Sequence, residues 1–194
     1  QLIGFDIHGK TIGIIGTGKI GSVFATIMKG FGCTLLGYDL QENKELIANT
    51  NLVYTSFEEV CKQSDIVAVF CPLTPETKFL FNKTTFAMMK KGVFFINTAR
   101  GGIVNTKDLI EALENKTIAA AGLDVYENEK NILFNNHPEE DIVDEMFNKL
   151  CTFTNVILTG HQGFLTNEAL SGIAKTTFEN INYWESVGKS NNDL

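Results

Sequence analysis

The sequence predicts an α/β fold, in which a doubly wound parallel sheet of about seven strands is covered by helices. Short apolar segments of strand length alternate along the 194 residues with segments of helical periodicity, a rhythm typical of a parallel sheet with crossover helices. The apolar runs at 66–70 and 93–96 are continuous, which is typical of strands covered on both faces. With 44% hydrophobic residues, the chain has enough apolar surface for one sizeable core.

Seven segments are expected to be strands, because each is short, apolar and bounded by glycine or polar residues. In chain order they are Thr11–Ile15, Thr34–Tyr38, a short segment at Val53 and Tyr54, Asp65–Phe70, Gly92–Asn97, Ile118–Leu123 and Val156–Thr159.

The helices are expected between these strands. The first covers Lys19–Gly30, and its apolar residues recur at helical spacing on one face: Ile20, Val23, Phe24, Ile27 and Met28. Ser56 is a candidate N-cap with Glu59 three residues later, which predicts a helix to about Lys62. Periodicity predicts further helices at Lys83–Lys90, Asn105–Glu114, Asp141–Leu150 and Asn167–Val187, the last capped by Thr166 or Asn167 and ended near Gly188. The segments 71–76 and 126–140 are expected to be irregular.

Charge and cysteine content argue against several kinds of partner. The net charge of −7 is scattered, with no basic stripe, so no nucleic-acid partner is expected. The apolar runs are much shorter than the roughly 20 residues that span a bilayer, so no membrane partner is expected either. The four cysteines, without a CxxC pair, indicate reduced thiols packed as small apolar residues in a cytoplasmic protein, and no metal site: Cys33, Cys61, Cys71 and Cys151.

A glycine-rich turn joins the first expected strand to the first helix. It reads Gly16-Thr17-Gly18-Lys19-Ile20-Gly21, the pattern of a Rossmann-type dinucleotide-binding turn. Gly16 would permit the tight turn, Gly18 the approach of a pyrophosphate to the backbone, and Gly21 close packing of the helix on the sheet. The helix N-terminus would then bind the phosphates through free N–H groups and the helix dipole.

Asp39 ends the second strand, 18 residues after Gly21. A carboxylate at this position accepts hydrogen bonds from both adenosine ribose hydroxyls and repels a 2′-phosphate. No arginine follows among the next residues, so NAD is expected rather than NADP. A strand-end carboxylate without a ligand is the structural alternative.

Arg100 is the only arginine beside fifteen lysines. Its retention suggests a function that lysine cannot perform, such as a planar two-pronged grip on a carboxylate. It follows the strand Gly92–Asn97, at the end of the strand where open α/β sheets bind ligands. A structural salt bridge is the alternative.

Acidic residues and a histidine follow the last two strands. His161 is a candidate proton donor and acceptor, or a structural histidine, whereas His8 and His137 are expected to be packing or solvated residues. A neighbouring carboxylate would stabilise the His161 imidazolium, and the residues alone leave open whether it is Asp124, Glu127 or Glu129. A solvated surface acid is the default interpretation of Glu127.

Five motifs occur in a fixed order: Gly16–Gly21, Cys71–Thr74, Asn97–Gly101, Asp124–Glu129 and Gly160–Gln162. Together they cover nearly the whole chain and resemble the D-2-hydroxyacid dehydrogenases. Within this family, Gly160–Thr166 and Asp124–Glu129 are most similar to the D-lactate dehydrogenase branch. Phosphoglycerate and formate dehydrogenases usually have proline where this chain has Gly160.

The resemblance implies site residues and a reaction. Its catalytic residues would be Arg100, Glu129 and His161, which selects Glu129 as the partner of the histidine. The substrate would be a small 2-oxo acid such as pyruvate, reduced by NADH to the D-2-hydroxy acid. The implied cofactor-binding residues are Gly16, Gly18, Lys19, Ile20, Gly21, Asp39, Cys71, Pro72, Thr77, Thr98, Ala99 and Asp124.

The resemblance also implies how the chain is organised. Residues 1–166 would form the NAD-binding domain, and 167–194 a C-terminal helix and tail leading to a mostly missing substrate domain. Because Gln1 is not a natural start, a processed or cloned fragment is expected, inactive alone, with a homodimer formed through the coenzyme domain. The alternatives are a dehydrogenase for glycerate, phosphoglycerate or hydroxyisocaproate, or an NADH-sensing module like certain transcriptional corepressors.

Overall fold

The computed structural model of the protein describes residues 4–129, 132 and 144–188. These residues divide into two compact units, 1–160 and 161–194. The expected domain boundary after residue 166 stays a prediction. His137 and the expected helix start at Asp141 lie outside the described residues.

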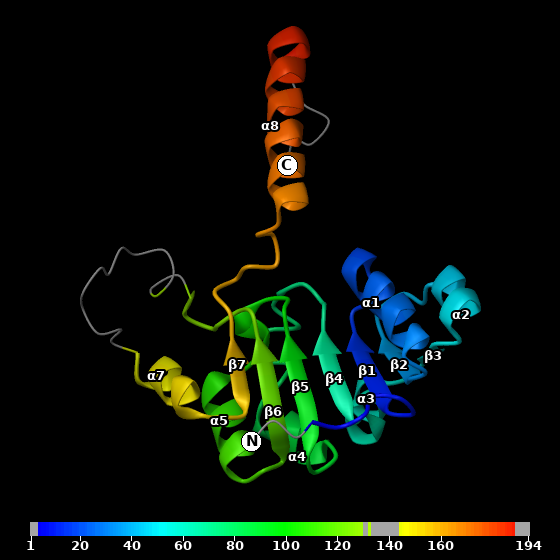
Figure 1. The fold of residues 1–194 in the computed structure, drawn as a ribbon, viewed down its shortest axis with the longest axis vertical. Coiled ribbons are helices and arrows are strands. Elements are labelled where there is room, and N and C mark those ends of the chain that lie inside the picture. The colour runs from blue at the N-terminus through cyan, green and yellow to red at the C-terminus, as the bar shows by residue number, and fades with distance from the viewer. Residues whose placement is uncertain (1–3, 130–131, 133–143, 189–194) are drawn as a thin grey trace. The chain divides into compact units, whose positions relative to one another are not determined.

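The first unit is built on a seven-stranded, wholly parallel sheet in the order β3-β2-β1-β4-β5-β6-β7 (Figure 1). This confirms the predicted doubly wound α/β fold, and the strand order reverses between β1 and β4. Open sheets of this kind bind ligands beside such a reversal, at the carboxyl ends of the strands. The strands are β1 (Thr11–Ile15), β2 (Thr34–Tyr38), β3 (Val53–Tyr54), β4 (Ile66–Val69), β5 (Val93–Asn97), β6 (Ile118–Leu123) and β7 (Val156–Leu158).

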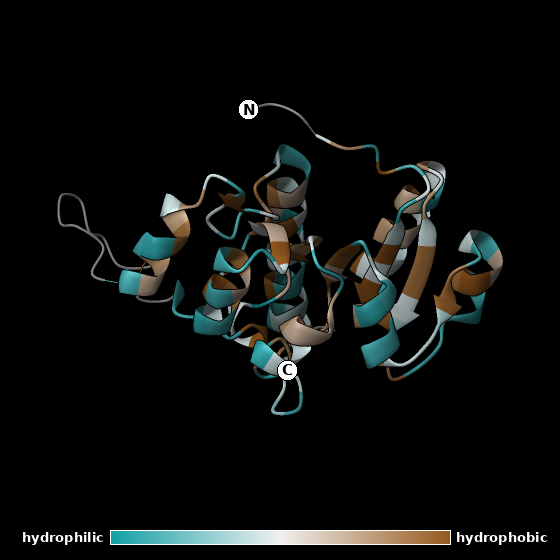
Figure 2. Cartoon of the chain, turned by 90° about the horizontal axis from the view of Figure 1, so that it is seen from below, coloured by the Kyte–Doolittle hydropathy of each residue, from teal (hydrophilic) through white to brown (hydrophobic). Residues whose placement is uncertain are grey.

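Helices cover the sheet on both sides of its β1–β4 half. Helices α1 (Lys19–Gly30) and α2 (Lys44–Thr50) pack on one face through Ala25 and Leu46. Helices α3 (Phe57–Gln63), α4 (Lys83–Met88) and α5 (Thr106–Glu114) pack on the other face, and α7 (Glu145–Thr152) lies beside α5. In Figure 2 the apolar colour is concentrated on the strands, and the hydrophilic colour on the outer turns of the helices.

The second unit is built around the long helix α8 (Asn167–Val187). The hydroxyl of Thr166 accepts a hydrogen bond from the Ala169 N–H at 3.1 Å, and the helix ends at Gly188 with φ of 76°. The predicted helix and its N-cap are therefore confirmed. None of the described helices combines the length and apolar character needed to cross a bilayer.

The structure adds two features to the predicted helices. The first is α2, which no periodicity predicted: its N-cap Asn43 accepts a hydrogen bond from the Leu46 N–H at 3.0 Å, and only Leu46 and Thr50 of this short helix are buried, too few to show a period. The second concerns α1, which has its predicted bounds, but whose apolar residues Ile20, Val23 and Ile27 are 71%, 60% and 52% exposed. Gly21 and Ala25 are the buried residues of α1, since small side chains let the helix approach the sheet.

Two further expectations needed correction. Strands β1 and β4 are buried as expected, but Ile157 in β7 is 71% exposed and β5 alternates between buried and half-buried residues. The described helices of the first unit that pack on this half, α4, α5 and α7, lie on one face only. The four cysteines are free, but only Cys61 is fully buried and Cys151 is exposed, so they are not all core residues.

Candidate functional site

The candidate residues of the first unit lie along one edge of the sheet. Because all seven strands are parallel, their carboxyl ends meet at the same edge. The phosphate loop follows β1, Asp39 follows β2, Cys71 and Pro72 follow β4, Thr98 to Arg100 follow β5, and Asp124 follows β6. The topology therefore brings together groups that are far apart in sequence.

The three glycines of the loop meet different surroundings. Gly16 has φ of +94°, and a Cβ there would lie 2.6 Å from the backbone nitrogen of Cys71. A Cβ at Gly21 would collide with the carbonyl oxygen of Gly16. At Gly18, by contrast, a Cβ would have nothing within 4 Å. The fold itself therefore requires Gly16 and Gly21, whereas Gly18 borders open space.

The N-terminus of α1 offers unpaired N–H groups to a ligand. Gly18 is its N-cap and supplies no capping side chain. Every other described α-helix has an N-cap side chain that accepts a backbone N–H: Asn43, Ser56, Asn82, Asn105, Asp144 and Thr166. The first N–H groups of a helix have no intrahelical partner, and together with the helix dipole they favour an anion. The open space at Gly18 and this uncapped terminus fit the pyrophosphate of a dinucleotide.

Asp39 is bound to the phosphate loop. Its Oδ2 accepts hydrogen bonds from the backbone N–H of Thr17 at 2.6 Å and from the Thr17 hydroxyl at 3.1 Å. Its Oδ1 accepts the Leu40 N–H at 2.7 Å. The carboxylate is half-buried beside the loop. Thr17 was not among the residues predicted for the site, because its role appears only from its hydrogen bonds to the end of the neighbouring strand β2.

The loop after β4 is held by Thr77. Its hydroxyl donates a hydrogen bond to the carbonyl oxygen of Pro72 at 2.7 Å and accepts one from the Thr74 N–H at 2.7 Å. Burial raises the pKa of the Cys71 thiol to about 11, with the Asp39 charge adding to the rise. Cys71 is therefore a protonated thiol at neutral pH.

Arg100 lies in a turn that is held by the side chain of Asn97. The buried side chain of Asn97 accepts the Ala99 N–H at 3.0 Å and donates to the carbonyl oxygen of Arg100 at 3.0 Å. The Arg100 side chain itself is exposed, and its Nη1 donates to the Ala99 carbonyl at 2.7 Å. The described residues thus hold the backbone of Arg100 firmly while its guanidinium faces solvent.

The turn after Arg100 packs against the segment that carries Glu129. A Cβ at Gly101, in the 3₁₀ turn Gly101–Ile103, would collide with the backbone of Tyr126 and Glu127. Arg100 and Glu129 consequently line one depression of about 410 Å³. The Glu129 carboxylate accepts the Tyr126 N–H at 3.2 Å.

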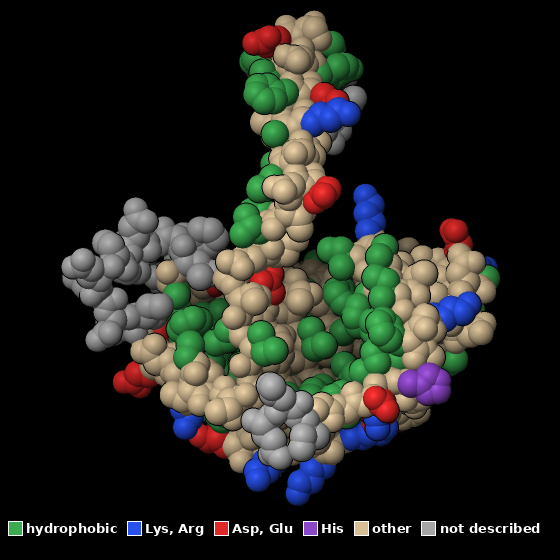
Figure 3. Space-filling model, in the orientation of Figure 1, with side chains coloured by type: hydrophobic (Ala, Val, Ile, Leu, Met, Phe, Trp, Pro, Cys, Tyr) green, Lys and Arg blue, Asp and Glu red, His purple; other side chains and the backbone are tan. Residues whose placement is uncertain are grey.

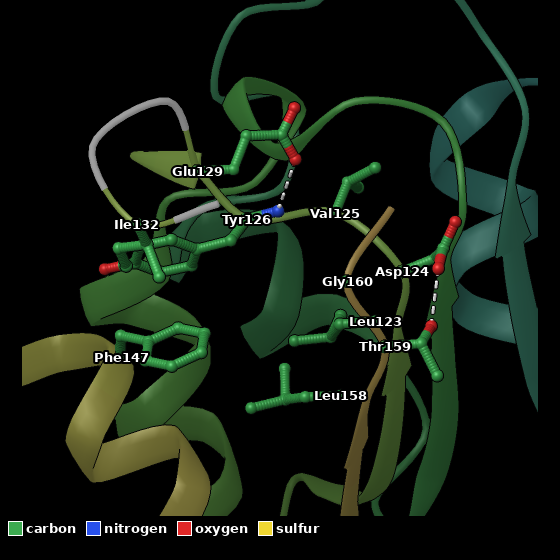
Figure 4. Close-up of a pocket in the computed structure, with 10 residues that line it drawn as sticks. All are labelled: Leu123, Asp124, Val125, Tyr126, Glu129, Ile132, Phe147, Leu158, Thr159 and Gly160. Carbon is green, nitrogen blue, oxygen red and sulfur yellow. Dashed lines mark hydrogen bonds between the residues drawn. The ribbon is translucent and has the colours of Figure 1, made fainter. Parts of the chain in front are cut away.

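Two neighbouring acids have structural partners. Glu127 accepts the Thr106 N–H at the start of α5 at 3.1 Å, so its default interpretation as a solvated surface acid was wrong. Asp124 accepts a hydrogen bond from the Thr159 hydroxyl at 2.5 Å (Figure 4).

A small apolar pocket lies beside Asp124 and Glu129. It has a volume of about 100 Å³, and Figure 4 shows Leu123, Leu158 and Phe147 on its walls. The buried Tyr126 donates its hydroxyl to Asp144 at 2.8 Å, and Asp144 also caps α7. Burial, and then the Asp144 carboxylate, raise the pKa of Tyr126. This tyrosine therefore stays protonated and ties the Glu129 segment to α7.

His161 begins the second unit. Its φ is +53°, in the left-handed region that non-glycine residues rarely adopt. Such a conformation is retained where the surrounding structure demands it, and is frequent at functional sites.

Comparisons with known proteins identify the family. Residues 1–163 match the model of the D-isomer specific 2-hydroxyacid dehydrogenase NAD binding domain. The chain is 46% identical over 181 residues to a 2-hydroxyacid dehydrogenase homolog of Zymomonas mobilis, covering 93% of this chain and 55% of that protein. It is 41% identical to the D-lactate dehydrogenase of Escherichia coli, covering 100% and 58%.

A solved structure gives the same result. The NAD complex of the D-isomer specific 2-hydroxyacid dehydrogenase from Lactobacillus delbrueckii superposes with a TM-score of 0.90 at 32% identity, covering 98% of this chain and 57% of that one. The chain belongs to the D-isomer specific 2-hydroxyacid dehydrogenases and comprises their NAD-binding domain. The cofactor of this domain is NAD. The chain spans little more than half the length of the relatives it matches.

Proposed function

We propose that the protein containing this domain reduces pyruvate to D-lactate with NADH and catalyses the reverse reaction. The observation that carries the proposal is the depression lined by Arg100 and Glu129, at the same sheet edge as the uncapped phosphate loop. The similarity to the Escherichia coli protein, which is named D-lactate dehydrogenase, supports this choice of substrate. The free cysteines are consistent with a cytoplasmic enzyme.

The proposed chemistry assigns one task to each catalytic residue. The Arg100 guanidinium binds the carboxylate of the 2-oxo acid with two parallel hydrogen bonds and polarises the ketone. When bound, NADH would supply the hydride for the carbonyl carbon. His161, with Glu129 as its carboxylate partner, gives a proton to the oxygen that becomes the hydroxyl. In the reverse direction neutral His161 removes that proton.

The cofactor contacts follow the sheet edge. We assign Gly16, Gly18, Lys19, Ile20 and Gly21 to the pyrophosphate and Asp39 to the adenosine ribose. Cys71, Pro72 and Thr77 would flank the cleft, and Thr98, Ala99 and Asp124 would lie near the nicotinamide. The support for these positions is their shared place at the carboxyl ends of five parallel strands.

The proposed assembly is a homodimer through the coenzyme domain. Figure 3 shows a stripe of apolar side chains over α1, where Val23, Ile27 and Phe31 are 60%, 52% and 51% exposed. Exposed apolar patches of this kind favour association. Sedimentation velocity should show that the unsubstituted protein is a dimer and that the Val23→Glu variant is a monomer. A monomeric unsubstituted protein would contradict the proposal.

The activity is tested in two steps. Residues 1–194 should bind NADH more tightly than NADPH in calorimetric titrations and turn over pyruvate far more slowly than the full-length dehydrogenase. In the full-length protein, kcat/KM should be higher for pyruvate than for hydroxypyruvate or branched 2-oxo acids, and His161→Ala should lower turnover by about 10²–10⁴. A higher kcat/KM for another 2-oxo acid would contradict the assignment of pyruvate as the substrate. Near-normal turnover of His161→Ala would contradict the role of this histidine as the proton donor.

A further inference from the structure

Three side chains from separate segments form one hydrogen-bonded chain beside the phosphate loop. The Tyr54 hydroxyl, in β3, donates to the hydroxyl of Thr17 at 2.7 Å. The Thr17 hydroxyl in turn donates to Oδ2 of Asp39 at 3.1 Å, and the Thr17 N–H donates to the same oxygen at 2.6 Å. Neither Thr17 nor Tyr54 belongs to the expected cofactor contacts.

The direction of this chain is fixed by Asp39, because a carboxylate only accepts hydrogen bonds. The single Thr17 hydroxyl proton therefore goes to Asp39, and the Tyr54 hydroxyl proton goes to the Thr17 oxygen. At the other end, the Tyr54 oxygen accepts the backbone N–H of Asn43 at 3.1 Å, and Asn43 is itself the N-cap of α2. Hydrogen bonds aligned in this way strengthen one another at low local dielectric.

Thr17 is suited to transmit this constraint. It is 4% exposed, and its carbonyl oxygen accepts the Ser22 hydroxyl at 2.6 Å. Its N–H, hydroxyl and carbonyl are thus all engaged, so its side chain has no alternative rotamer without leaving a buried polar group unpaired.

The network leaves one weakly occupied acceptor position on Asp39. A carboxylate has about four acceptor sites. Thr17 occupies two on Oδ2, and the Leu40 N–H occupies one on Oδ1 at 2.7 Å, whereas the Gln41 N–H makes only a long hydrogen bond of 3.5 Å to Oδ1. A stronger donor such as a ribose hydroxyl would replace this long bond. A 2′-phosphate brings negative charge and acceptors, and a carboxylate fixed in this orientation cannot turn away from it.

We propose that Tyr54, acting through Thr17, is a positioning residue that sets the selectivity of this domain for NAD over NADP. The inference rests on the proposed contact of Asp39 with the ribose. Without the Tyr54 hydroxyl, the Thr17 hydroxyl loses the donor that orients it, and its hydrogen bond to Asp39 is weakened. The carboxylate is then held chiefly by the Thr17 and Leu40 N–H groups, and the charge that excludes the 2′-phosphate is less firmly oriented.

The experiment is a calorimetric measurement of Kd for NADH and NADPH with residues 1–194 and their variants. Tyr54→Phe and Thr17→Val should each lower the ratio of Kd(NADPH) to Kd(NADH) by about 3–10-fold, the equivalent of one ordinary hydrogen bond. Thr17→Ser keeps the hydroxyl and should retain the wild-type ratio. The matched control is Tyr38→Phe, which removes a hydroxyl of the residue preceding Asp39 in sequence; its ring packs on Phe57, and the hydroxyl forms no hydrogen bond within the described chain.

Asp39→Asn distinguishes the ribose contact of Asp39 from the positioning role of Tyr54. It should lower the ratio of Kd(NADPH) to Kd(NADH) more than any other variant. If it does so while Tyr54→Phe and Thr17→Val keep the wild-type ratio, the positioning role is refuted and the role of Asp39 stands. If Asp39→Asn also keeps the ratio, both the ribose contact and the positioning role are refuted. A fall in affinity for both nucleotides at constant ratio identifies Tyr54 as merely structural, and thermal melting confirms that each variant is folded.

Discussion

The side-chain amide of Asn97 holds both ends of the turn that presents Arg100. It accepts the Ala99 N–H and donates to the Arg100 carbonyl oxygen, each at 3.0 Å, from a position that is 1% exposed. The backbone oxygen of Asn97 also accepts the Asp124 N–H at 3.0 Å. One buried residue thus connects the turn after β5 with the start of the segment after β6.

Asn97→Ala should lower the free energy of unfolding of this chain by about 1–3 kcal/mol, because a backbone donor and acceptor lose their buried partner. In the full-length dehydrogenase it should also lower kcat/KM for the 2-oxo acid by about tenfold, equivalent to about 1.4 kcal/mol. Urea denaturation and steady-state kinetics measure the two effects. Thr98→Ala, at an exposed neighbour, is the control for stability, and an unchanged unfolding midpoint for Asn97→Ala would contradict the bracing role.

Gly18 can be tested separately from the fold. A Cβ there meets no atom within 4 Å, so Gly18→Ala should leave stability within about 0.5 kcal/mol. The same methyl group would stand where the pyrophosphate approaches the loop, and it should weaken NADH binding by about tenfold or more. Gly30→Ala is the matched control, because Gly30 lies at the other end of α1 with equally open surroundings. Equal NADH affinity in both variants would place the phosphates elsewhere.

The cysteines should differ widely in alkylation rate. Thiolates react, and thiols do not. Burial raises the pKa of Cys71 to about 11 and that of Cys61 to about 12, whereas Cys151 is exposed. Iodoacetamide at pH 8 followed by peptide mass spectrometry should therefore show Cys151 modified first. Between pH 8 and pH 10 the Cys71 rate should still be rising, and rapid modification of Cys71 at pH 8 would show that its thiol is not buried as described.

Asp65 should make stability depend on acid pH. Burial opposes its ionisation, but the Thr11 N–H and Lys90, each at 2.9 Å, outweigh burial and lower the pKa of its carboxyl below the ordinary 3.8. A lowered folded-state pKa contributes stability that is present above the unfolded-state value and is lost as the pH falls through the folded-state value. Asp65→Asn should lower the free energy of unfolding by about 1 kcal/mol at pH 7. The expected effect is modest because the Asp65 side chain is 34% exposed.

The difference in free energy of unfolding between the wild type and Asp65→Asn should become smaller as the pH falls below about 4. Guanidinium denaturation at several pH values measures it, with Asp6→Asn, at an exposed residue near the N-terminus, as the control. A difference that stays constant down to pH 2 would mean that the carboxylate charge is not responsible.

The sequence determined most of the fold, since strands and helices depend on local patterns, and the family resemblance of its motifs implied the proposed catalytic residues. The continuous apolar runs marked the strands, and the glycine-rich turn with an acid 18 residues later marked the dinucleotide loop. The order of motifs identified Arg100, Glu129 and His161 as candidates. The sequence could not reveal α2, whose buried residues are too few to show a period.

Tertiary structure decided what holds these residues in place. The contact of Gly101 with the backbone of Tyr126, and the chain from Tyr54 through Thr17 to Asp39, join segments that are 22 to 37 residues apart. No periodicity records which side chains meet at such distances, because the pairing is set by strand order and by the register of the sheet. The exposed apolar stripe on α1 was hidden for the same reason, since helical spacing shows that apolar residues share a helix but not which of them the sheet covers.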